Sequence, residues 1–391
     1  MDEKNTDMTY DFTTEGAPRG TNSVKWDKRP DVLPMWVAEM DFPVAPFIVD
    51  AVRARVDRAV FGYTLVPDSY YECVTRWFDG RYGWAPAREE IIPVCGIVPA
   101  TSIAVKALTE PGDKVVFFTP AYNCFFHNIT NPGGVENRCE LVWNPELSRY
   151  EVDWADFEAR IADPQTKAFL LCNPHNPCGR LWSREELLRM GRICKEHGVP
   201  VISDEIHCEI VAPGTRYVPF ATLFPQDCIS FVSPTKPFSM PGLEIANIIC
   251  ANAGFRARLD RVINIWEHCD VNQLGIVALQ AAYTPEGADW LDQMNAVVHA
   301  NYVDLRDRFS AEFPQVRVAK LEATYLDWLD FAPLGLSGKQ IQDHLLEHQK
   351  LWVNAGDMYG GPSCMRINLA CPRSTMKKAL DLYAEGIKEL L

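Results

Sequence analysis

The chain has 391 residues, of which 47% are apolar and 23% charged, which predicts a globular protein with a large buried core and excludes a disordered or collagen-like chain. Its 52 acidic and 38 basic side chains give a net charge of −14, and no block of Lys and Arg offsets it, so nucleic-acid binding is not expected. No apolar run reaches the roughly 18 residues of a membrane span, and residues 1–10 are acidic and polar where a signal peptide would be basic and then apolar. We therefore expect a cytoplasmic protein that does not bind membranes.

The predicted elements alternate between helix and strand from residue 69 onward, after an irregular N-terminal stretch. They are a helix over 69–82, strands over 114–118 and 168–172, a helix over 183–197, and strands over 199–203, 229–233 and 246–250. Ser183 and Glu186 form a capping box at the start of the fourth element, and Gly198 stands just beyond its end. This alternation is typical of an α/β protein with a parallel sheet, whose ligands bind beyond the carboxyl ends of the strands.

The pattern changes after Pro285. The elements expected there are a helix over 288–313, strands over 316–320 and 325–331, a helix over 338–348, a strand pair over 351–354 and 365–370, and a helix over 375–391. They predict a smaller α+β domain, on which the apolar N-terminal segment should pack. The expected division is a large domain over 48–286 and a small domain formed by 1–47 and 287–391.

The thirteen cysteines are scattered through apolar segments, which predicts small buried side chains in a reducing compartment. Cys172 and Cys178 bracket a loop, but no second pair of cysteines or histidines stands at zinc-site spacing, so no metal is expected.

Lys236 follows a predicted buried strand, and the hydroxyls of Ser233 and Thr235 stand shortly before it. A partly desolvated lysine can form a Schiff base because its pKa is lowered, and neighbouring hydroxyls can bind a phosphate. For these few residues alone, a surface lysine in a turn is the better interpretation.

Asp204 ends another predicted strand. A carboxylate that stays ionised in a cleft can pair with a pyridinium nitrogen. A structural acid, or a metal ligand together with Glu205 and His207, are the alternatives that these residues leave open.

Two turns add candidate ligand groups. The Pro- and Asn-rich turn over 173–179 would direct the Asn173 amide into the same crevice, although turn formation alone would explain its composition. Gly96 opens a predicted helix, whose free N–H groups and dipole suit a phosphate.

The order and spacing of Gly96, Tyr122, Asn173, Asp204 and Lys236 resemble those of fold-type I pyridoxal-phosphate enzymes of the class I/II aminotransferase superfamily. The resemblance covers nearly the whole chain and includes residues 38–42 and 366–370. It implies an α/β fold with a mostly parallel seven-stranded sheet sandwiched by helices, plus a smaller α+β domain.

The resemblance also implies pyridoxal 5'-phosphate as the cofactor and assigns roles by position. Lys236 would be the catalytic Schiff-base lysine and proton shuttle, while Ala38 and Arg366 would bind the substrate, Arg366 by clamping its α-carboxylate. The residues expected to hold the cofactor are Gly96, Ile97, Val98, Tyr122, Asn173, Asp204, His207, Ser233, Thr235 and Tyr63.

Within this set, Asp204 would pair with the pyridinium nitrogen, Asn173 would donate to the phenolic oxygen, and Tyr122 would stack on the ring. Tyr63 would reach the phosphate in the neighbouring subunit, which implies an obligate homodimer with shared sites. The alternatives are a core aromatic for Tyr122 and a surface arginine for Arg366.

Shorter segments resemble one branch, the cystathionine β-lyase (MalY/PatB) group of carbon–sulfur lyases; they are 21–27, 35–42, 173–177, 203–207 and 371–374. His207 fits this branch, because many aminotransferases have a tyrosine there. Glu39 and Ser239 depart from the aspartate and asparagine common in the branch, and Glu244 stands where many aminotransferases have a phosphate-binding arginine.

The expected function is therefore a pyridoxal-phosphate-dependent carbon–sulfur β-lyase that converts cystathionine or cysteine S-conjugates to a thiol, pyruvate and ammonia. An aminotransferase of amino-acid metabolism is the alternative, because the catalytic residues are common to both reactions. A binding or regulatory protein that merely retains the fold is disfavoured by the intact set of Lys236, Asp204 and Asn173.

Overall fold

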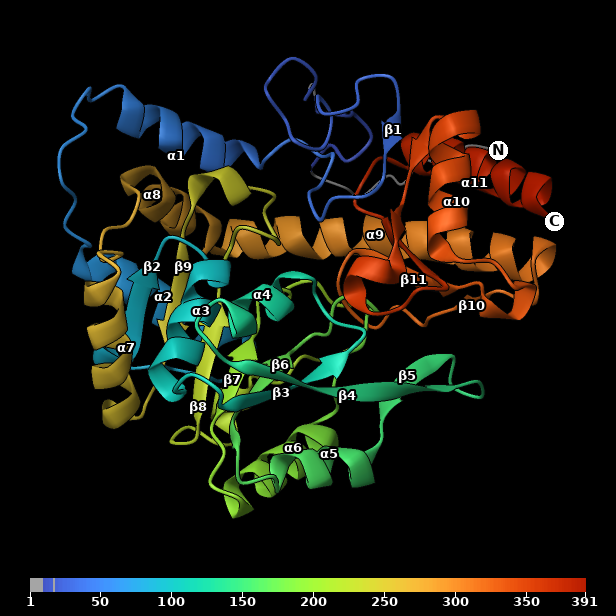
Figure 1. The fold of residues 1–391 in the computed structure, drawn as a ribbon. Coiled ribbons are helices and arrows are strands. Elements are labelled where there is room, and N and C mark those ends of the chain that lie inside the picture. Colours follow the sequence, from blue (N-terminus) through green and yellow to red (C-terminus); the bar gives the residue numbers. More distant parts are fainter. Residues whose placement is uncertain (1–9, 17) are drawn as a thin grey trace.

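An eight-stranded sheet forms the centre of the computed structural model, which describes residues 10–16 and 18–391 (Figure 1). The strand order is β2-β9-β8-β7-β6-β3-β4-β5, and the five strands from β8 to β4 in this order are parallel. The strands are β2 (Ile91–Val94), β3 (Lys114–Thr119), β4 (Val135–Asn144), β5 (Arg149–Val152), β6 (Thr166–Cys172), β7 (Val201–Asp204), β8 (Cys228–Val232) and β9 (Ala246–Ile249).

The sheet has one strand more than the seven expected. β4 pairs with β3 only through Glu140, so its last four residues extend beyond that partner. β5 turns back and pairs antiparallel with this overhang, from Leu141 opposite Val152 to Asn144 opposite Arg149. The expectation of seven strands was therefore wrong because the extra length of β4 supports a hairpin.

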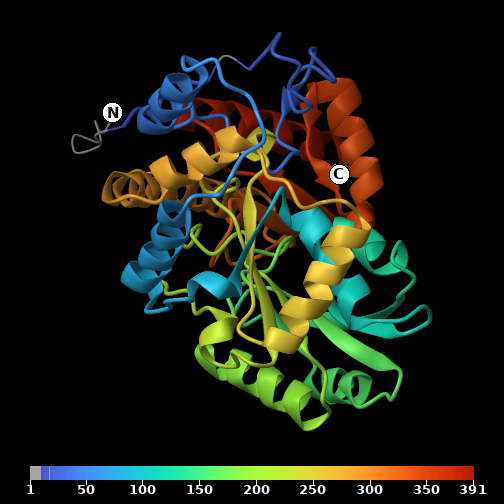
Figure 2. The same cartoon turned by 90° about the vertical axis from the view of Figure 1, so that its left-hand side faces the viewer.

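Helices cover both faces of the sheet, because side chains of successive strand residues point to opposite sides. In β3, Val115 and Phe117 pack in one core with α3, α4 and α7, while Val116 and Phe118 pack in the other with α2, α5 and α6. Figure 2 shows α2 and α7 on opposite sides of the sheet. These helices are α2 (Asp68–Tyr82), α3 (Ile97–Leu108), α4 (Cys124–Thr130), α5 (Trp154–Ile161), α6 (Arg184–Glu196) and α7 (Ala253–Ile265).

The C-terminal part of the chain forms a four-stranded antiparallel sheet of order β10-β11-β14-β13, with α9 running from the large sheet to this part (Figure 1). Its strands are β10 (Arg317–Val318), β11 (Leu326–Asp330), β13 (Asn354–Ala355) and β14 (Cys364–Asn368). The remaining α-helices are α1 (Pro46–Val56), α8 (Gln273–Ala282), α9 (Pro285–Glu312), α10 (Gly338–His344) and α11 (Arg373–Leu390).

The N-terminal segment lies against the C-terminal part. β1 (Leu33–Pro34) pairs in parallel with β12 (Leu351–Trp352), and the Asn368 side chain donates to the carbonyl oxygens of Val37 and Glu39, each at 2.6 Å. The single strand expected over 351–354 is instead two short strands, β12, which pairs with β1, and β13, which pairs with β14.

Side-chain caps mark the first residues of α6 and α9. The capping box of Ser183 and Glu186 is confirmed at the start of α6. α9 begins at Pro285, earlier than expected, because proline fits the first turn of a helix and the Thr284 hydroxyl accepts from the Gly287 N–H at 3.1 Å.

The division into domains stays a prediction, and residues 1–9 and 17 of its small domain lie outside the described residues. Among the described helices, none is long and apolar enough to cross a membrane.

Candidate active site

A cavity of about 610 Å³ lies beyond the carboxyl ends of β6, β7 and β8. Of the thirteen residues predicted from the sequence to act in a site, ten line it: Ala38, Gly96, Ile97, Val98, Tyr122, Asp204, His207, Thr235, Lys236 and Arg366. Three do not line it, namely Tyr63, Asn173 and Ser233. Parallel strands explain this convergence, because residues far apart in the sequence end at one edge of the sheet.

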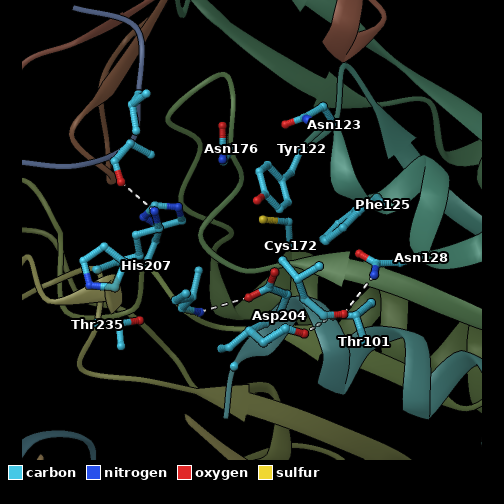
Figure 3. Close-up of a pocket in the computed structure, with 18 of the residues that line it drawn as sticks. Thr101, Tyr122, Asn123, Phe125, Asn128, Cys172, Asn176, Asp204, His207 and Thr235 are labelled. Atoms are coloured by element: carbon cyan, nitrogen blue, oxygen red, sulfur yellow. Dashed lines mark hydrogen bonds between the residues drawn. The ribbon is translucent and has the colours of Figure 1, made fainter. Parts of the chain in front are cut away.

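Asp204 is the last residue of β7 and is buried at the floor of the cavity, where Figure 3 shows it below Tyr122 and Cys172. Its Oδ1 accepts the Ile206 N–H at 3.1 Å. Burial raises the pKa of its carboxyl to about 7, against the opposing effects of that N–H and of Lys236. A cationic ligand group beside Asp204 would therefore be stabilised by the carboxylate.

The raised pKa of Asp204 predicts how the stability of the ligand-free protein depends on pH. The folded state binds the proton of Asp204 more tightly than the unfolded state. The free energy that this proton adds to stability is therefore present in full below about pH 4 and is lost as the pH rises through 7. We expect Asp204→Asn to gain free energy of unfolding relative to the wild type, by about 1 kcal/mol for each pH unit between 4 and 7.

Urea unfolding of both proteins, stripped of ligand, at pH 5 and pH 7 measures this difference. The pKa of Glu205 is also raised to about 7 by burial, but Glu205 is present in both proteins, so the difference isolates Asp204. If the free energy of unfolding of the two proteins changed with pH in parallel, the pKa of Asp204 would not be raised by burial.

Lys236 lies in the turn after β8, and its Nζ donates to the Ala38 carbonyl oxygen at 2.5 Å. Burial, and then the nearby Arg366 guanidinium, lower the pKa of its amine to about 8. A larger fraction of the amine is therefore neutral near pH 7 than for an exposed lysine, so the group can act as a nucleophile or a base.

Arg366 is buried on β14 and faces the cavity. Its Nη1 donates to Asn176 Oδ1 at 3.2 Å, its Nη2 donates to the Trp36 carbonyl oxygen at 3.0 Å, and the Tyr359 ring lies 4.4 Å from its Cζ. Among the described residues no carboxylate forms an ion pair with it, and burial lowers its pKa. A buried guanidinium with neutral partners is suited to bind a carboxylate, so a surface arginine is excluded.

The N-terminus of α3 forms another wall. Gly96 is its N-cap, and the N–H groups of Ile97 and Val98 have no acceptor within the helix. The Thr235 hydroxyl lines the same cavity, while the Ser233 hydroxyl lies behind it, 2.7 Å from Thr235 Oγ1, and donates to the Ile245 carbonyl oxygen at 2.7 Å. These donors suit an anion.

Glu244 also lines the cavity, with a backbone in the left-handed region at φ 48°. Its carboxylate contributes, after burial, to the raised pKa of Cys95, the residue before Gly96. An acid thus stands on this side of the cavity, where the donors are the N–H groups at the start of α3 and the Thr235 hydroxyl.

Tyr122 and His207 both line the cavity, and Figure 3 shows Tyr122 above Asp204 and His207 to its left. Burial raises the pKa of Tyr122, and burial with the nearby Lys236 and Arg366 lowers the pKa of His207 to about 3. The imidazole is therefore neutral, and its Nδ1 is buried without a hydrogen-bond partner.

Asn173 follows β6, and its amide nitrogen donates to the Val218 carbonyl oxygen at 3.1 Å and to Glu205 at 3.4 Å, while its Oδ1 is buried without a partner. Glu205 also accepts from the Ser203 hydroxyl at 2.8 Å, the Phe220 N–H at 2.9 Å and the Tyr217 hydroxyl. Glu205 is thus a structural acid, and no metal-binding cluster of three ligands occurs in the described ranges. The metal alternative for Asp204 has no support, and the donor role of Asn173 stays a prediction.

Three residues of the site were not assigned a role from the sequence. Asn176 and Tyr359 hold Arg366, and the Tyr325 hydroxyl donates to the Ala38 carbonyl oxygen at 3.0 Å. Asn176 belongs to the turn over 173–179 and could have been assigned from it, whereas Tyr325 and Tyr359 follow no distinctive local pattern.

Residues 27–382 match the model of the family described as Aminotransferase class I and II. The chain belongs to this family. It is 38% identical over 387 residues to cystathionine beta-lyase PatB of Bacillus subtilis, with 95% of this chain and 98% of that protein covered. It is 31% identical to protein MalY of Escherichia coli, with coverages of 97% and 99%. The crystal structure of the PLP-bound C-S lyase from Staphylococcus hominis superposes with a TM-score of 0.90 at 30% identity, covering 97% of this chain and 98% of that one.

These similarities confirm the resemblance seen in the sequence at the levels of family and branch. The aminotransferase fold is likewise confirmed, with the correction of one added strand.

Proposed function

We propose that this class I/II aminotransferase family member is a pyridoxal-phosphate-dependent carbon–sulfur β-lyase acting on cystathionine or cysteine S-conjugates. One observation carries the proposal: a single cavity holds a lysine of lowered pKa, a buried aspartate of raised pKa, and a buried arginine without a carboxylate partner. The likeness to PatB and to the Staphylococcus hominis C-S lyase favours the lyase reaction over transamination.

The residues present fit the cofactor. Asp204 would pair with its ring nitrogen, and the α3 N-terminus with Thr235 would bind its phosphate. The buried, unpartnered atom His207 Nδ1 belongs to a cavity-lining side chain whose hydrogen-bonding capacity the protein itself leaves unused.

The reaction follows from these roles. Arg366 binds the α-carboxylate of the substrate, and the neutral amine of Lys236 removes the α-proton. When bound, the cofactor supplies an electron sink for the pair that this proton leaves behind. The Cβ–S bond then breaks, the sulfur leaves with the bonding pair and takes up a proton, and water converts the three-carbon remainder to pyruvate and ammonia.

Incubation of the purified holoenzyme with L-cystathionine or S-benzyl-L-cysteine, without added keto acid, tests the proposal. Pyruvate and thiol should appear together over many turnovers. A reaction that stops after one turnover and resumes only when a keto acid is added would show that the protein is an aminotransferase.

We also propose a homodimer in which Tyr63 acts in the neighbouring site. The Tyr63 side chain is fully exposed at 102% of its reference area, and Val60, Phe61 and Leu65 beside it are exposed as well. Such a run of exposed apolar side chains favours a protein partner.

Mixed dimers provide the test. Tyr63→Ala and Lys236→Ala chains, each with its own tag, should both be poorly active as homodimers. The mixed dimer regains one intact site, made of Lys236 from one chain and Tyr63 from the other, so we expect roughly half of the wild-type rate per dimer. If Tyr63 acts within its own chain, or not at all, the mixed dimer shows no such gain.

A further inference from the structure

The Ala38 carbonyl oxygen holds the amine that the proposed reaction uses as its base. It accepts from Lys236 Nζ at 2.5 Å and from the Tyr325 hydroxyl at 3.0 Å. An amine that donates one N–H to a fixed oxygen has its lone pair on another side, so the place of this oxygen decides where the lone pair points. A small displacement of the base is costly, because proton removal requires close and aligned atoms.

Asn368 fixes the peptide groups on both sides of that oxygen. Its Nδ2 donates to the carbonyl oxygens of Val37 and Glu39, each at 2.6 Å, and its Oδ1 accepts the Ala370 N–H at 2.8 Å. Both N–H bonds of the amide are therefore employed, and the side chain is 1% exposed. A shift of the backbone at Ala38 would break these hydrogen bonds.

A second group, the ammonium of Lys25, holds the same backbone. Its buried Nζ donates to the Glu39 carbonyl oxygen at 2.8 Å and to Asp41 Oδ1 at 2.7 Å, and the same carboxylate oxygen accepts from Trp26 Nε1 at 2.8 Å. A buried ion pair adds little to stability, because the cost of removing two charges from water offsets most of their attraction. Its directional bonds instead specify one arrangement of residues 39–41.

Arg366 depends on the same segment. Its Nη2 donates to the Trp36 carbonyl oxygen at 3.0 Å. Asn368 bonds the residues before and after Trp36, since its backbone N–H donates to the Met35 carbonyl oxygen at 2.9 Å and its side chain donates to the Val37 carbonyl oxygen. The two cations that act on the substrate are thus tied to one short stretch of chain.

We propose that Asn368 and Lys25 are positioning residues that hold the backbone over 36–39. By this contact they place Lys236 for removal of the α-proton and Arg366 for binding of the α-carboxylate. Neither Asn368 nor Lys25 lines the cavity, so neither touches the substrate. The inference rests on the part of the proposed function in which Lys236 is the base, and it adds no step to that reaction.

Asn368→Ala provides the first test, with S-benzyl-L-cysteine and its α-deuterated form as substrates. We expect kcat to fall by at least about tenfold, because the base is displaced, and KM to rise, because Arg366 moves with the Trp36 carbonyl. The deuterium isotope effect on kcat should be at least as large as in the wild type, which assigns the loss to proton removal. The variant stripped of ligand should also form the band of lysine-bound cofactor more slowly when pyridoxal phosphate is added.

Asn295→Ala is the matched control. Asn295 is 8% exposed, and its amide nitrogen donates to the Glu209 carbonyl oxygen at 2.9 Å, but neither residue lines the cavity. Loss of a buried amide should lower the melting temperature of both variants. Only Asn368→Ala should change kcat, KM and the rate of cofactor uptake.

The double variant Lys25→Met, Asp41→Asn tests the ion pair, because it removes both charges and leaves neither unpaired. We expect a smaller loss of kcat, about threefold, since Asn368 still holds the Glu39 carbonyl oxygen. If Asn368→Ala does not fold, Asn368→Asp takes its place, because it keeps the volume and the acceptor for the Ala370 N–H but lacks the two N–H donors.

Unchanged kcat and KM in the Asn368 variant and in the double variant, with only their melting temperatures lowered, would overturn the inference and leave the lyase reaction intact. If the wild type released no pyruvate, the proposed function would fail. Loss of α-deuterium from the substrate to water would then still test the inference, because it requires only proton removal. Slower loss in the variants than in the wild type would support the inference, and equal loss would overturn it.

Discussion

Replacement of Lys236 by alanine is expected to lower pyruvate release by about four orders of magnitude, because the variant loses the base that removes the α-proton. The variant should still fold, since the substitution removes an amine whose charged form burial disfavours. Its absorption spectrum with added pyridoxal phosphate should also lack the band of lysine-bound cofactor. Rates and spectra together check the prediction.

Lys195→Ala is the matched control. Its side chain is 64% exposed and lies 3.4 Å from Asp227 on the surface, so turnover should stay at the wild-type level. If Lys236→Ala retained turnover within tenfold of the wild type, Lys236 could not be the base.

Replacement of Arg366 by alanine should raise KM by about 100-fold, with a smaller change in kcat, because the α-carboxylate loses its charge-assisted hydrogen bonds. A guanidinium has five N–H bonds, and the two contacts to Asn176 and Trp36 leave three of them for the substrate. Arg366→Lys keeps the charge but not the planar fork, so it should recover only part of the loss.

Steady-state kinetics on S-benzyl-L-cysteine measures both variants. Arg306→Ala removes a surface ion pair with Asp307 and a contact with the Tyr302 ring, both away from the cavity lining, so it serves as the control and should change neither constant. An unchanged KM in Arg366→Ala would show that the carboxylate binds elsewhere.

Local signals at the ends of predicted strands marked Asp204, Lys236 and the turns at Gly96 and Asn173 as candidates. Their roles, and the choice of Tyr122, His207 and Arg366, depended on the resemblance to the aminotransferase superfamily. Asp204 closes β7, and the turn with Lys236 follows β8 directly. Parallel pairing explains why these residues converge, since the carboxyl ends of the strands before them meet at one edge of the sheet.

The contacts that were not predicted depend on tertiary structure. Asn173 is turned toward Glu205 by a buried network that includes Tyr217 and Phe220, which are distant in sequence. The eighth strand depends on how far β4 extends past β3, a length that the local pattern of residues does not encode.

The segment over 36–39 contacts both Lys236 and Arg366 through its backbone. Carbonyl oxygens of Trp36 and Ala38 receive Arg366 and Lys236, and those of Val37 and Glu39 receive Asn368. Substitution of a side chain leaves these acceptors in place, although alanine at Glu39 would also remove a carboxylate that raises the pKa of Lys236. The lysine and the arginine therefore keep their positions for as long as the backbone over 36–38 keeps its path, whatever side chains it carries.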